Sequence, residues 1–139
     1  MQIKKFAIAI LTVLFLIPQT TWAKTIRVKF PAGRSTVVLK GKTTGGPSES
    51  GGMDPVNYQL RARKGQQMTL HLTSAKKNAV FAIYLPGMDL LETPRQTSDS
   101  HSGARDWKGT LPKSGIYEII VFPEDEATDT SFTLEITIR

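Results

Sequence analysis

Apolar and polar residues alternate with a period of two along most of the chain beyond residue 23. Near the end, Phe132, Leu134, Ile136 and Ile138 alternate with polar or charged residues. In a β-strand this alternation points one set of side chains toward a core and the other toward water. Four other stretches follow the same rule, and we predict a strand in each: residues 26–30, 58–62, 68–72 and 81–85.

Residues 116–122 differ, because they are apolar on both faces except at Glu118. Such a segment is typical of a strand in the middle of a sheet. Glycine and proline mark turns between the apolar stretches, as in Lys64-Gly65, Pro86-Gly87 and Pro112-Lys113-Ser114-Gly115. No segment shows helical spacing. Seven or eight short strands separated by such turns predict an all-β fold, an antiparallel sandwich or barrel.

The first 23 residues have a different pattern. Lys4 and Lys5 precede an apolar run over residues 6–17, and Thr21-Trp22-Ala23 supplies the small residues at which a signal peptidase cuts. We therefore expect a signal peptide at 1–23, a single domain at 24–139 and a periplasmic or secreted protein. The apolar run is too short for a stable membrane anchor. The chain has no cysteine, which excludes disulfides.

Two long polar stretches interrupt the alternation. Residues 43–55 contain four glycines, and residues 93–106 contain Asp99 and His101. Connections of this length are often either functional or disordered.

The formal charge is +6, and loss of Lys4 and Lys5 with the signal peptide leaves +4. Residues 24–77 contain eleven Lys or Arg and two acids, whereas residues 78–139 contain ten acids and five bases. A domain divided in this way could steer a charged partner. Solvated outer faces of strands would produce the same division.

The residues of catalysis are sparse, so we expect no enzyme. Without cysteine there is no thiol nucleophile, and no serine lies in a Gly-x-Ser-x-Gly turn. His71 stands between Leu70 and Leu72, which places its ring on the outer, solvent-exposed side of a strand. His101 beside Asp99 is the remaining candidate, and would be the base of a secreted hydrolase.

No metal, cofactor or nucleic-acid site is expected either. The two histidines lack zinc-site spacing, and Glu124, Asp125, Glu126 and Asp129 lack the pattern of a calcium loop. Nucleic-acid binding would need exposed aromatic residues among the basic ones. The alternation instead assigns the aromatic residues of the basic half, Phe30 and Tyr58, to the core.

Three stretches resemble one family. They are residues 58–68 (YQLRARKGQQM), residues 107–119 (WKGTLPKSGIYEI) and the closing alternation over residues 132–138. Together with the export signal they resemble the bacterial periplasmic inhibitors of goose-type (g-type) lysozyme. The same strand and turn pattern is similar to the pre-peptidase C-terminal β-sandwich found beside secreted proteases. The resemblance implies a single antiparallel β-sandwich that inserts loops into the substrate cleft of a glycosidase.

The resemblance also implies which residues bind. The turn Lys113-Ser114-Gly115 is the candidate inhibitory loop, because a hairpin tip loses little entropy on docking. Its hydroxyl and backbone groups would bond near the catalytic carboxylates of g-type lysozyme or another cell-wall glycosidase. Arg105 and Lys108 are expected beside it as cationic contacts. Tyr58 matches an aromatic position of the inhibitors and would line the interface, unless it lies in the core as its alternation favours.

One segment departs from the family. Where the inhibitors carry a basic loop with arginines, residues 122–129 are acidic, and acids would repel the carboxylates of a lysozyme cleft. Either the target differs, or the acids meet a basic rim, or inhibition is absent. The alternative function is a pre-peptidase-like module that binds cell-wall glycan or polymer. A row of exposed aromatic residues would favour it, yet Trp107, the only tryptophan after residue 23, is expected to pack at the start of a strand.

Overall fold

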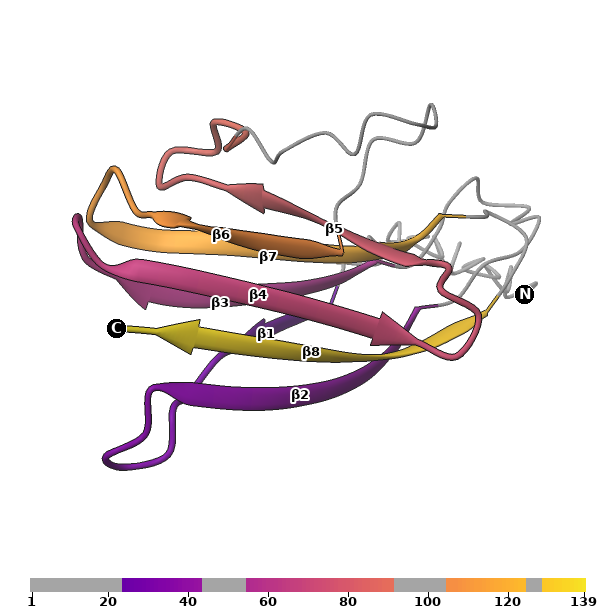
Figure 1. Cartoon of the computed structure of the whole chain (residues 1–139). Helices are drawn as coiled ribbons and strands as arrows, with labels where there is room; N and C mark the ends of the chain where they lie inside the picture. Colours follow the sequence, from indigo (N-terminus) through magenta and orange to yellow (C-terminus); the bar gives the residue numbers. More distant parts are fainter. Residues whose placement is uncertain (1–23, 44–54, 92–104, 125–128) are drawn as a thin grey trace, which may run out of the picture.

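Two four-stranded sheets pack face to face in the computed structural model, which describes residues 24–43, 55–91, 105–124 and 129–139 (Figure 1). One sheet has the order β1-β3-β7-β5 and the other the order β2-β8-β4-β6. All neighbouring strands are antiparallel except β1 and β3, which are parallel. The strands are β1 (Thr25–Arg27), β2 (Thr36–Thr43), β3 (Val56–Ala62), β4 (Gln67–Ser74), β5 (Ala79–Tyr84), β6 (Asp106–Thr110), β7 (Gly115–Pro123) and β8 (Thr130–Ile138). The predicted all-β sandwich is confirmed.

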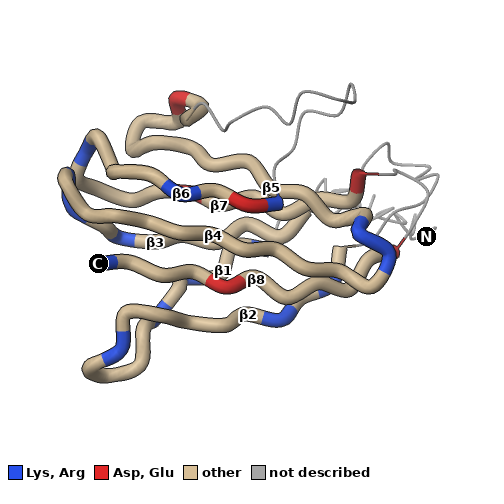
Figure 2. The backbone as a smooth tube through the Cα atoms, in the orientation of Figure 1, with Lys and Arg blue, Asp and Glu red and all other residues tan. Residues whose placement is uncertain are grey.

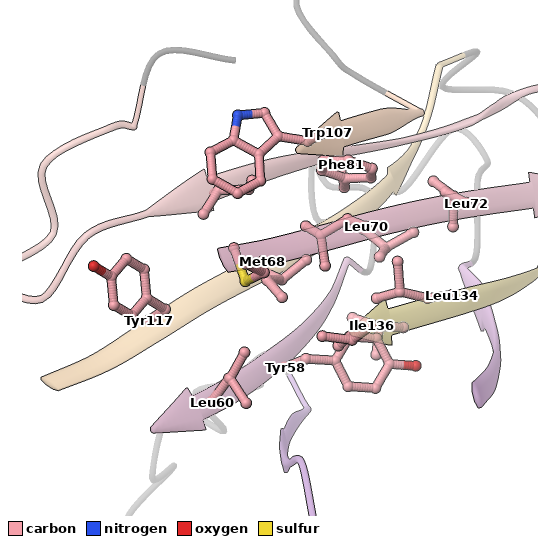
Figure 3. Packing of buried hydrophobic residues seen from close by; sticks show 14 of the residues in the cluster. Tyr58, Leu60, Met68, Leu70, Leu72, Phe81, Trp107, Tyr117, Leu134 and Ile136 are labelled. Atoms are coloured by element: carbon pink, nitrogen blue, oxygen red, sulfur yellow. The ribbon is translucent and has the colours of Figure 1, made fainter. Parts of the chain in front are cut away.

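The core lies between the sheets and follows the predicted alternation (Figure 3). From β3, β4, β5 and β8 the inward side chains are buried, and β7 lies between β3 and β5, as expected for the strand that is apolar on both faces. The first strand is shorter than predicted, because β1 ends at Arg27. Val28 and Phe30 beyond it are half-buried and still pack against the core.

Two strands have a glycine at an inward position, and in each case an aromatic ring fills the space. In β2, a Cβ on Gly41 would lie 2.5 Å from the Phe132 ring and 2.9 Å from the Tyr58 hydroxyl. In β6, a Cβ on Gly109 would lie 2.7 Å from the Trp107 ring. Such distances are too short for real contacts, so both glycines leave room for an aromatic ring that a side chain would displace.

The connections between strands lie at two opposite ends of the sandwich. In Figure 1 the β1–β2, β3–β4 and β6–β7 connections and the C-terminus lie together at the left. The end of β7 and the start of β8 lie at the right. Among the residues described, no helix is long and apolar enough to cross a membrane. The expected signal peptide and the His101–Asp99 pair lie outside the described residues.

Candidate functional site

Three turns meet at the left end of the sandwich, and we call them together the turn face. They are residues 63–66 between β3 and β4, residues 111–114 between β6 and β7, and residues 85–91 after β5. Two backbone bonds join the first to the second, from Gly65 N to the Leu111 carbonyl and from Leu111 N to the Gln66 carbonyl, both 2.8 Å. The Ser114 hydroxyl also accepts from Lys64 N at 2.9 Å. The predicted inhibitory turn is therefore tied to its neighbour.

Tyr117 holds the same turn from below. Its ring is fully buried, and its hydroxyl donates to the Lys113 carbonyl at 2.6 Å and accepts from Lys113 N at 3.2 Å. Tyr117 packs inward with the core residues (Figure 3). One buried hydroxyl thus fixes both backbone groups of the residue at the tip, and little freedom of the turn is left to be lost on binding.

Gly115 brings the turn after β5 against the tip. Its φ of 145° is a conformation that suits glycine, and a Cβ there would lie 2.8 Å from the Pro86 side chain. The Lys113 ammonium lies 3.8 Å from the Asp89 carboxylate. Met88 and Leu90, on either side of Asp89, are 59% and 61% exposed. The turn face therefore combines a cation with two exposed apolar side chains.

The charge of this end is strongly basic. Figure 2 shows blue segments at the left over the β6–β7 turn, the β3–β4 turn and the C-terminus. The bases of this end are Arg34, Arg61, Arg63, Lys64, Lys113 and Arg139. Among the described residues at this end, Asp89 supplies the acidic side chain. The turn face therefore presents a positive surface.

The structure does not bring the predicted supporting contacts to this turn. Arg105 lies at the opposite end, where its guanidinium bonds the Glu124 carboxylate and the Lys77 carbonyl. Lys108 is exposed on the outer face of β6, opposite Thr69 of β4. Tyr58 is 1% exposed and packs edge-on against Phe132, so it belongs to the core. Of the partner-binding residues predicted from the sequence, the structure brings together only Lys113, Ser114 and Gly115.

The acidic segment after β7 is partly neutralised. Glu124 pairs with Arg105, and the Asp129 carboxylate lies 3.2 Å from the Lys42 ammonium. Asp125 and Glu126 lie outside the described residues. Since the end of β7 and the start of β8 lie at the right end of the sheets, a partner docked on the turn face would not meet Glu124 or Asp129.

His71 lies beside Asp106 on an exposed face of the sheet. As predicted, it is exposed on the outer side of its strand, where Nδ1 bonds the Asp106 carboxylate. No group of three or more possible metal ligands occurs among the described residues.

The sequence pattern missed the apolar part of the turn face. Pro86-Gly87 was recognisable as a turn, but Met88 and Leu90 gave no periodic signal that would separate exposed apolar residues from buried ones. A fixed turn with a cation and exposed apolar side chains has the composition typical of protein-binding surfaces, in which apolar contacts are surrounded by polar ones.

Comparison with known proteins places the chain in a family. No protein-family model matches the chain, and no curated protein does. Among solved structures, the periplasmic inhibitor of g-type lysozyme (PliG) from Aeromonas hydrophila is similar at 30% identity and a TM-score of 0.63, with 84% of this chain and 96% of that chain covered. The chain therefore belongs to the family of periplasmic g-type lysozyme inhibitors.

Two further inhibitors share the fold. PliG of Salmonella Typhimurium aligns at 24% identity and a TM-score of 0.61, covering 84% of this chain and 98% of that one. A mutant of Escherichia coli PliG aligns at 24% identity and 0.60, covering 85% and 100%. A pre-peptidase C-terminal domain from Bacillus anthracis also aligns, but its TM-score of 0.44 is too low to support an argument. The likeness to PliG supports an inhibitor-like role, and these neighbours are inhibitors rather than enzymes.

Proposed function

We propose that the protein is an exported inhibitor of g-type lysozyme, or of another cell-wall glycosidase, that blocks the substrate cleft with its turn face. The observation that carries the proposal is the 30% identity to the Aeromonas inhibitor along 96% of that chain. The expected signal peptide at 1–23 directs the protein to the periplasm or beyond. Inhibition by occlusion needs no cofactor and no covalent step.

Charge complementarity supports the turn as the inserted element. Glycosidase clefts contain paired carboxylates. The Lys113 ammonium stands at the tip of the turn with half of its side chain exposed, at the basic end of the domain. Opposite charges speed association and select the partner. The Ser114 hydroxyl already accepts from Lys64 N, so toward a carboxylate it acts as a donor.

Preorganisation of the turn and exposed apolar area also contribute to the affinity for the partner. The Tyr117 hydroxyl and the bonds between the two turns hold the tip in place before binding, which lowers the entropy lost in the complex. Met88 and Leu90 provide apolar contacts next to the cation. Such contacts, shielded from water in the complex, are the usual source of affinity in protein interfaces.

The test is charge reversal at the tip. Lys113→Glu should weaken inhibition of g-type lysozyme at least tenfold, because a carboxylate replaces the cation that faces the cleft. The fold should be little affected, since the pair with Asp89 is long and exposed. Lys76→Glu makes the same change in the exposed turn between β4 and β5, at the other end, and should leave inhibition within twofold. Equal inhibition by both variants would remove the turn from the interface.

The alternative, a module that binds glycan or polymer, remains a prediction. Trp107 is 7% exposed and packs in the core, so it offers no stacking surface for sugar rings. Retention of the protein on insoluble peptidoglycan, together with no effect on any lysozyme, would favour this alternative.

A further inference from the structure

An open pocket lies beside the turn face, between the two sheets at the same end of the sandwich. Its volume is about 820 Å³, within the range of small-molecule sites. Four separate segments line it: the β1–β2 connection, the end of β3 with the following turn, the β6–β7 turn and the end of β8. We call it the arginine pocket.

Three arginine residues line this pocket. They are Arg34 on the β1–β2 connection and Arg61 and Arg63 at the end of β3, and all three residues are exposed. Among the residues that the structure describes, no Asp or Glu lines the pocket. Within the described chain, none of the three arginines makes an ion pair. Three arginines gathered at one opening, with no ion pair in the described chain, favour an anion, since each guanidinium can bind two oxygens of a carboxylate or phosphate.

The deeper lining is apolar. Ala62 is buried, and Phe30 and Ile138 are half-buried and pack against the core. A simple inorganic anion would meet the arginines and leave this surface to water. An apolar group on the ligand would displace weakly bound water from this apolar lining and so increase the affinity. A neutral lipid-like molecule, in turn, would leave the arginines without a partner.

The wall of the pocket is fixed before any ligand arrives. The β1–β2 connection is anchored at one end by Val28 N to the Gln59 carbonyl and at the other by Ile138 N to the Ser35 carbonyl, both 2.8 Å. Between these anchors Arg34 N bonds the Pro31 carbonyl at 3.0 Å, which closes the turn that carries the first guanidinium. The β1–β2 connection thus crosses from one sheet to the other with both of its ends held by hydrogen bonds. The pocket that it lines is therefore preformed.

We propose that the arginine pocket binds a small amphiphilic anion, a carboxylate or phosphate attached to a short apolar chain or ring. The anionic head lies among Arg34, Arg61 and Arg63, and the apolar part lies on Phe30, Ala62 and Ile138. This inference goes beyond lysozyme inhibition, because the ligand is a small molecule and binds in the absence of any lysozyme. The pocket shares Ser114 and Gly115 with the turn, but it does not require the turn to enter a cleft.

The test is a titration of the purified protein, followed by backbone amide NMR shifts, with decyl phosphate and with decanoate below their micelle-forming concentrations. One or both should bind and shift the amides of Gly33, Ser35 and Gly115. Inorganic phosphate and the neutral decyl maltoside should each bind at least tenfold more weakly than the better decyl anion. The phosphate and carboxylate arms also decide which head group the site prefers.

The double variant Arg61→Gln/Arg63→Gln should weaken binding of the better anion at least tenfold, because it removes two of the three charges. The control Lys40→Gln/Lys76→Gln removes two exposed charges away from the pocket and should change binding less than twofold. No binding of either decyl anion would overturn the proposal. So would equal binding of inorganic phosphate or decyl maltoside, or equal loss in both double variants.

Discussion

Two buried tyrosines offer a matched test of how the turn is held. Tyr117 and Tyr58 are 0% and 1% exposed, and replacement by phenylalanine removes only a hydroxyl from each. In Figure 3 the two hydroxyls point in opposite directions. That of Tyr117 makes two hydrogen bonds to Lys113, whereas that of Tyr58 is buried and has no hydrogen-bond partner among the described residues. The same chemical change should therefore have opposite effects.

For Tyr117→Phe we expect a loss of about 1–2 kcal/mol in the free energy of unfolding, since each net hydrogen bond contributes about 1 kcal/mol. Lys113 is exposed, so its freed backbone groups can bond water and add no further cost. In a domain of this size that loss lowers Tm by roughly 5–10 °C. The looser turn should also weaken lysozyme inhibition by about fivefold, as ordering it on binding costs about 1 kcal/mol.

For Tyr58→Phe the free energy of unfolding should be unchanged or higher by about 1 kcal/mol. The reason is that folding of the variant no longer buries a hydroxyl without a hydrogen bond, which costs free energy. Inhibition should not change. Urea denaturation and a lysis assay on both variants supply the two readouts. The reasoning is refuted if Tyr58→Phe destabilises the protein as much as Tyr117→Phe, or if Tyr117→Phe alters neither stability nor inhibition.

Two other outcomes follow from single positions. Gly115→Ala should cost about 1–3 kcal/mol, because φ is 145° and a Cβ would lie 2.8 Å from Pro86; Gly33→Ala, also at positive φ but with nothing within 4 Å, should cost clearly less in the same urea titration. Burial raises the pKa of Tyr58 above its ordinary value of 10.0, so the folded protein keeps a proton that the unfolded chain releases. Stability from this group is full below pH 10 and falls as the pH rises through the folded pKa. Wild type should therefore lose more stability than Tyr58→Phe between pH 9 and pH 11, and identical losses would contradict this.

Alternation predicted the core well where each inward position carries an apolar side chain. Leu134 and Ile136 of β8 and Leu70 of β4 were identified in this way and are buried. β2 was not identified as a strand, because its inward position at Gly41 has no side chain and the ring of Phe132 occupies the space. A periodic pattern depends on the side chains of the strand itself. It cannot reveal that a ring from a neighbouring strand fills the inward position.

The candidate site was predictable only where it is local in sequence. The turn from Lys113 to Gly115 has its own glycine and proline signals. Arg105 is only eight residues from Lys113, but β6 between them is extended, and five residues at about 3.3 Å each separate the two ends by roughly 16 Å. The arginine pocket has no signal of this kind, since its lining comes from four segments that only the packing of the two sheets brings together.

The most direct measurement of the central claim is a peptidoglycan-clearing titration of the protein against g-type, chicken-type and invertebrate-type lysozymes, at low and physiological salt. We expect inhibition of the g-type enzyme at stoichiometric amounts and no comparable effect on the other two. Inhibition should weaken at higher salt, because a cationic turn face binds an acidic cleft. Full activity of all three enzymes at a large excess of the protein would contradict this expectation.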